Sequence, residues 1–193
     1  MTLERFQHVK QKQDNDSWLA CAAMLEVYRR ERTRTGTDDF STDPSGVYNE
    51  LRATYLHENR GIDEAALPQG NTFDFLINRF ECPNYKIVIY KWAIPTFEQI
   101  KSRIDMGFPF VCFVKGVAPP TEFETEEKRY NYCQGDDGHS VIICGYDEEA
   151  DGGVRKICVS DPKPDIAETT IIPYHQTQYR DGLYWWFTFA ENI

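Results

Sequence analysis

The sequence lacks the features that mark membrane proteins and disulfide scaffolds. No apolar stretch approaches the length of a membrane span, and residues 1–8 show neither a basic start with an apolar core nor a small-residue cleavage site. The 6 cysteines form no CxxC pair, so buried free thiols are expected and no zinc site or other cofactor is suggested. We therefore expect a cytoplasmic protein, although one secreted or delivered without a signal peptide would look the same.

Positive charge is also in short supply. The chain has 21 Lys and Arg against 31 Asp and Glu, a net charge of -10. Because binding to phosphates needs clustered cations, we expect neither nucleic acid nor an anionic membrane as the main partner. The one locally basic run, residues 29–34, is interpreted as the solvated end of a helix. There are no internal repeats, and 193 residues fit one domain, 1–193.

The pattern of apolar residues changes along the chain. The first half predicts helices at about 17–32, 44–55, 71–80 and 95–105, a strand at 85–92 and an edge strand within Leu3 to Val9. The second half contains short apolar runs bounded by Gly, Pro and Asp, at 108–114, 141–145, 157–159, 169–172 and 184–189. Such runs are typical of strands in one buried sheet. We predict an α+β fold, in which an N-terminal helical half packs on a C-terminal, mostly antiparallel sheet.

The stretch Asp14-Asn15-Asp16-Ser17-Trp18 turns abruptly into an Ala-rich apolar segment. This is a helix start, where Ser, Asp and Asn are preferred capping residues. On its own, Ser17 is best explained as a cap. However, a side chain at this place also lies at the positive end of the helix dipole, which suits a developing anion.

Other motifs accompany Ser17 along the chain. They are Gln11, Trp18 after the Ser, Gly138-His139 before an apolar strand, and Asp161-Pro162 after another. This order resembles the papain-like cysteine peptidases over most of the chain. It is most similar to the compact bacterial branch, with the double-glycine leader peptidases of bacteriocin exporters and the effector proteases of plant pathogens. The family has Cys where this chain has Ser17.

The resemblance implies a role for each of these residues. Ser17 takes the place of the nucleophile, His139 is the base, and Asp161 orients the imidazole. His139 alone could be structural, and Asp-Pro is a common turn. Because Asp161 ends a strand about twenty residues after His139, neighbouring strands would bring the two side chains together.

Two further roles concern the helix start and the segment before it. Gln11 is the expected oxyanion donor, and the six-residue spacing of the family selects it over its rival Gln13. Trp18 covers the site and contacts substrate, or is a core aromatic. Cys21, one turn into the helix among apolar neighbours, is expected to be an inert structural thiol.

The predicted function is a cysteine-type peptidase acting on a protein or peptide through an acyl-enzyme, with no cofactor and an open oligomeric state. A hydroxyl at position 17 cannot form the thiolate, so we expect little or no turnover. Ser17 is then a Cys-to-Ser change that traps a substrate or stops self-cleavage, a natural pseudoenzyme, or a true serine variant; the first is favoured. The alternatives are a pseudopeptidase that binds a peptide or leader sequence, and a toxin or effector domain.

Overall fold

The structure is a computed structural model that describes the chain in separate stretches. They are residues 1–4, 6–13, 16–33, 43–61, 85–91, 95–115, 138–148, 153–162, 169–174 and 183–191. In residues 85–91, 113–115, 138–139, 170, 172–173 and 183–191 only the main chain is described. The helix expected at 71–80 and the segment 117–137 lie outside the described residues.

Helices and strands follow one another in the order that the sequence predicts. The described helices are α1 (Ser17–Thr33), α2 (Pro44–Glu58) and α4 (Phe97–Asp105). The strands are β1 (Tyr85–Lys91), β2 (Phe110–Lys115), β3 (Gly138–Asp147), β4 (Lys156–Ser160), β5 (Thr170–Pro173) and β6 (Leu183–Glu191). The predicted α+β class is therefore confirmed.

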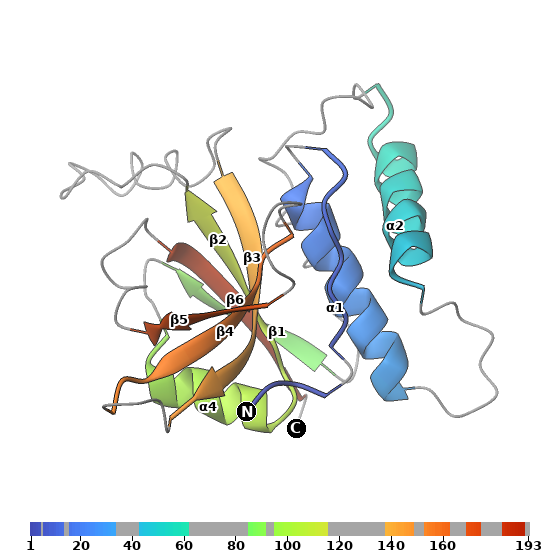
Figure 1. Ribbon diagram of the computed structural model, residues 1–193. Helices are drawn as coiled ribbons and strands as arrows, with labels where there is room; N and C mark the ends of the chain where they lie inside the picture. Colours follow the sequence, from blue (N-terminus) through green and yellow to red (C-terminus); the bar gives the residue numbers. More distant parts are fainter. Residues whose placement is uncertain are drawn as a thin grey trace.

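All six strands belong to one antiparallel sheet in the order β1-β6-β2-β3-β4-β5. The last strand of the chain lies between β1 and β2, so a strand from the first half completes the sheet (Figure 1). In the middle of the sheet His139 of β3 pairs with Val114 of β2, and Ile142 pairs with Ser160 of β4. The ends of β3 and β4 are thus neighbours at the place where the sequence predicts a site.

α1 is the central helix, lying between the sheet and α2 (Figure 1). Every residue from 17 to 28 is buried, although the helix has no narrow apolar stripe. Small residues such as Ala20 and Ala23, both 0% exposed, allow close approach on one side, while Trp18 packs edge-on against Tyr55 of α2 at 4.8 Å between ring centroids. A helix buried on all sides holds the orientation of its first residue firmly.

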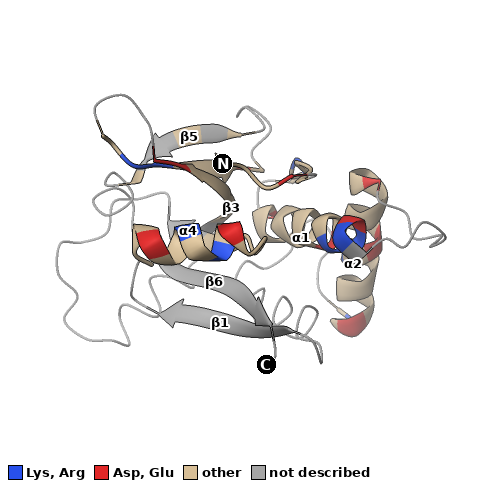
Figure 2. Ribbon diagram, turned by 90° about the horizontal axis from the view of Figure 1, so that it is seen from below, with Lys and Arg blue, Asp and Glu red and all other residues tan. Residues whose placement is uncertain are grey.

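The other helices begin at side-chain caps. Asp43 accepts a hydrogen bond from the Gly46 amide at 2.7 Å before α2. Thr96 and Gln99 form a capping box before α4. α4 buries an apolar face against the sheet and carries its charged residues on the outside, visible as red and blue bands in Figure 2. Both caps are of types that stabilise a helix by roughly 1 kcal/mol.

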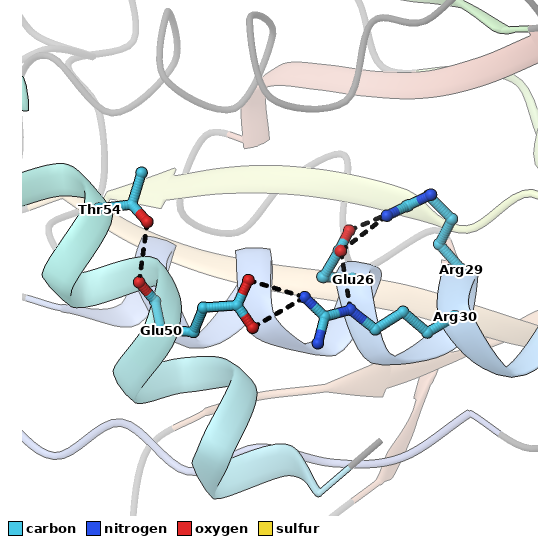
Figure 3. Close-up of polar contacts among 5 residues, drawn as sticks. All are labelled: Glu26, Arg29, Arg30, Glu50 and Thr54. Carbon is cyan, nitrogen blue, oxygen red and sulfur yellow. Dashed lines mark hydrogen bonds and ion pairs between the residues drawn. The ribbon is translucent and has the colours of Figure 1, made fainter. Parts of the chain in front are cut away.

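An ion-pair network joins the C-terminal part of α1 to α2 (Figure 3). Glu26, only 1% exposed, pairs with Arg29 and Arg30, and Arg30 also pairs with Glu50 of α2 at 2.9 Å. The interpretation of this basic run as a solvated helix end is therefore wrong for Arg30, whose side chain is 9% exposed. Carboxylates on two helices neutralise the guanidinium and permit its burial.

The N-terminal segment differs from the expected edge strand. It forms only an isolated antiparallel bridge between Thr2 and Gly145, supported by the Leu3 amide donating to the Cys144 carbonyl at 2.8 Å. The approach is so close that a Cβ on Gly145 would lie 2.5 Å from the Met1 carbonyl oxygen. No helix among the described stretches is both long and apolar enough to cross a membrane.

Candidate active site

Ser17 is the first residue of α1, and its hydroxyl faces the sheet. The Asp16 carbonyl accepts the Ala20 amide at 3.0 Å, so Asp16 occupies the capping position. The Ser17 Oγ accepts a hydrogen bond from the Ser140 amide at 3.1 Å, a buried contact across 123 residues of sequence. Ser17 therefore joins the start of α1 to β3 and is more than a helix cap.

The same contact brings the main chain of His139 to the helix start. Ser140 follows His139 directly, and consecutive Cα atoms are about 3.8 Å apart. His139 belongs to β3, but its side chain lies outside what the structure describes. The segment carrying the proposed base is thus placed beside residue 17, and the position of the imidazole stays a prediction.

Asp161 lies on the same side of the molecule. It follows β4 directly, one residue beyond the Ile142–Ser160 pair, so a continued register would bring it opposite Val141, two residues after His139. Its charge adds to the rise in the pKa of the Cys21 thiol, one turn along α1 from Ser17. The role of Asp161 as the group that orients His139 stays a prediction.

Gln11 is anchored beside Asp161. Its main-chain N–H donates to the Pro162 carbonyl at 2.8 Å, and its side-chain Nε2 donates to the Gln13 carbonyl at 3.0 Å. Gln11 is 7% exposed. The rival Gln13 contributes its carbonyl, which also accepts the Asp16 amide at 3.3 Å. The Gln11 side chain is thus held in the turn that leads into α1.

Trp18 and Cys21 lie on the buried sides of α1. Trp18 is 2% exposed with its ring against Tyr55, as expected of a core aromatic, so its role toward substrate stays a prediction. Cys21 is 0% exposed, and burial, with Asp161 adding to it, raises the pKa of its thiol well above the ordinary value. A thiol that stays protonated and inaccessible is a poor nucleophile.

Two polar contacts beside the site have no counterpart in the sequence analysis. Asp16, immediately before Ser17, is 0% exposed and accepts a hydrogen bond from the Tyr48 hydroxyl of α2. His8, placed by its sequence in a polar stretch, is half-buried, with its Nδ1 2.8 Å from the Oγ of Ser160. Neither could be identified from local sequence, because each partner lies far along the chain.

The arrangement suits acyl transfer. The first turn of α1 offers main-chain N–H groups and the positive end of its dipole, next to a side-chain hydroxyl and a carboxamide. Among the described residues, no group of three or more His, Cys, Asp or Glu side chains could hold a metal ion.

Comparison with known proteins bears on the fold. No family model and no curated protein matches the chain. A crystal structure of a protein from Bacillus anthracis, provisionally called a C39-like peptidase, matches with a TM-score of 0.55 and 16% sequence identity. The match covers 100% of this chain and 98% of that one. At this identity, the likeness shows that the two proteins share a fold.

Proposed function

We propose that this site is that of a papain-like cysteine peptidase in which Ser17 occupies the position of the nucleophile. His139 acts as the base, Asp161 orients it, and Gln11 with the residue 17 amide binds the oxyanion. The observation that carries the proposal is the hydrogen bond of 3.1 Å from the Ser140 amide to the Ser17 Oγ. It joins the N-terminus of a buried helix to the residue after His139.

With a thiolate at position 17, the reaction has two stages. The sulfur attacks the scissile carbonyl carbon, the oxyanion accepts hydrogen bonds, and the imidazolium protonates the leaving amine as the C–N bond breaks. Water, deprotonated by the imidazole, then attacks the thioester, and the thiolate leaves with the peptide acid released. The helix dipole and the imidazolium stabilise the thiolate before substrate binds.

A hydroxyl at position 17 does not form a stabilised anion before substrate binds. Its proton must be removed during attack, in a geometry shaped for a larger sulfur atom. We therefore propose that the chain with Ser17 is inactive or nearly so and corresponds to a Cys-to-Ser form. The same hydroxyl supports a second candidate, a pseudopeptidase that binds a peptide or leader sequence at this site without cutting it.

The test is the Ser17→Cys variant. Mass spectrometry should locate iodoacetamide on position 17, with a pH midpoint at least about 1 unit below the 8.5 of a free thiol. Cleavage of the chain itself or of a denatured protein extract should appear and be abolished by adding His139→Ala. Cys21 should remain unlabelled in the native protein, which makes it an internal control for unfolding.

Two results separate the candidates. A thiol at position 17 that stays unlabelled in the native protein, or one that is labelled with an ordinary pKa and gives no cleavage, counts against the peptidase. Peptide binding to the unaltered chain, without cleavage in Ser17→Cys, supports the pseudopeptidase.

A further inference from the structure

Tyr48 makes the main polar contact between α2 and the start of α1. Its hydroxyl donates to Oδ2 of Asp16, and the two residues are 1% and 0% exposed. The main-chain amide of Asp16 donates to the Gln13 carbonyl at 3.3 Å. Asp16 therefore connects α2 to the turn before α1.

The ring of Tyr48 makes a second contact, with the segment that carries Gln11. The Lys12 Nζ lies 4.8 Å from the ring centroid and donates to Oδ1 of Asn49 at 2.8 Å. Cations over aromatic faces and charge-assisted hydrogen bonds both favour one position of the lysine. Lys12 follows Gln11 directly, so these two contacts attach the segment that carries Gln11 to α2.

We propose that Tyr48 is a positioning residue for the candidate active site, because it fixes Gln11 and residue 17 relative to each other through Lys12 and Asp16. This inference rests on the proposed function. The contacts of Tyr48 described above are with Asp16 and Lys12. Tyr48 acts through Lys12, which follows the oxyanion donor, and through Asp16, which precedes the nucleophile position.

Two other contacts between α1 and α2 join the helices within or beyond the first turn of α1. Trp18 packs on Tyr55, and Arg30 pairs with Glu50. Arg52 of α2 also acts on Asp16 through its charge, whereas Tyr48 donates a hydrogen bond to the carboxylate. Loss of Tyr48 should therefore disturb the site more than loss of an equally buried tyrosine on the same helix.

The experiment compares two reactions of the Ser17→Cys variant. Acylation by p-nitrophenyl acetate needs both the thiolate and the oxyanion donors, whereas alkylation by iodoacetamide needs only the thiolate. Adding Tyr48→Phe should lower the acylation rate about tenfold, less than the ~100-fold cost of losing an oxyanion donor outright, and change alkylation by less than about twofold.

Matched controls are available for both contacts of Tyr48. Tyr55→Phe removes a hydroxyl from a tyrosine that is also 1% exposed on α2 and should leave the ratio of the two rates unchanged. Lys12→Met should lower acylation. Lys101→Met, which removes a lysine at the same 4.8 Å from the ring of Tyr146, should not.

The outcomes are distinct. If Tyr48→Phe lowers acylation and alkylation in proportion, or no more than Tyr55→Phe does, Tyr48 is only a structural residue and the inference is overturned. If the parent variant shows no acylation, the proposed function fails, and hydrogen exchange decides the positioning claim. Tyr48→Phe should then speed exchange of the Asp16 amide more than Tyr55→Phe, and equal exchange in the two variants overturns the claim.

Discussion

Replacing Glu26 by Gln tests the ion-pair network that holds α2 against α1. The Glu26 carboxylate accepts hydrogen bonds from Arg29 at 2.7 and 2.9 Å and from Arg30 at 2.9 Å. The side chains of Glu26 and Arg30 are only 2% and 9% exposed. Glu26→Gln keeps the shape and removes the charge that neutralises a buried guanidinium.

The expected loss of stability depends on the ion pair that Arg30 keeps after the substitution. Breaking a buried pair by removing one partner costs about 3–5 kcal/mol. Arg30 keeps Glu50, which binds it with both oxygens at 2.9 Å, so we expect a loss of about 2–3 kcal/mol in the free energy of unfolding. Glu50→Gln is the matched control: it loses a bond to the same arginine, but Glu50 is 48% exposed, so its loss should stay below about 1 kcal/mol.

The pH dependence sharpens this prediction. Burial alone would raise the pKa of Glu26, but Arg29 and Arg30 outweigh it and lower the pKa below its ordinary 4.5. The ionised carboxylate therefore stabilises the fold above pH 4.5, and this contribution is lost as the pH falls through the lowered value.

Urea unfolding followed by tryptophan fluorescence should give a gap between wild type and Glu26→Gln at pH 7 that narrows below pH about 4.5. The reasoning would be refuted if Glu26→Gln and Glu50→Gln lost the same free energy of unfolding, or if the difference between wild type and Glu26→Gln did not change with pH.

Two further substitutions test the N-terminal contacts. Gly145→Ala should lower the free energy of unfolding, measured by heat or urea, by about 1–3 kcal/mol. The new Cβ would lie 2.5 Å from the Met1 carbonyl oxygen and 2.9 Å from the Thr2 Cα. Unchanged stability would mean that the N-terminal segment lies farther from β3 than the structure shows. Burial raises the pKa of the Asp16 carboxyl, although the hydrogen bond from Tyr48 opposes this. The protonated carboxyl therefore stabilises the fold below pH 3.8, and this contribution is lost as the pH rises through the raised pKa. Asp16→Asn should therefore gain stability relative to wild type between pH 3.5 and 7, about 1.4 kcal/mol for each tenfold change in proton affinity, and a constant difference in urea midpoint would contradict this.

Much of the fold could be predicted because local signals and tertiary packing agree. The first helix was expected at 17–32 and runs from Ser17 to Thr33. Thr96 and Gln99 mark the start of α4, and each apolar run of the second half became a strand. The strand predicted within Leu3 to Val9 is wrong for the described residues of this segment, and the bridge to β3 lies at Thr2.

The candidate site was predicted less completely. The order of motifs predicts that Ser17 and His139 meet, and the bond from the Ser140 amide brings the main chain of β3 to Ser17. The roles of the two side chains stay predictions. Asp16 could not be foreseen as buried, since a carboxylate before a helix usually caps it in solvent. Its burial depends on Tyr48, and α2 gives no local sign that it will lie against this turn.

The bond between residues 17 and 140 also matters while the chain is being made. The contact spans 123 positions, so α1 leaves the ribosome long before β3 is made. A growing chain therefore carries the start of α1 without the strand that binds it. Under the proposed function, the site is assembled only after synthesis has passed β3.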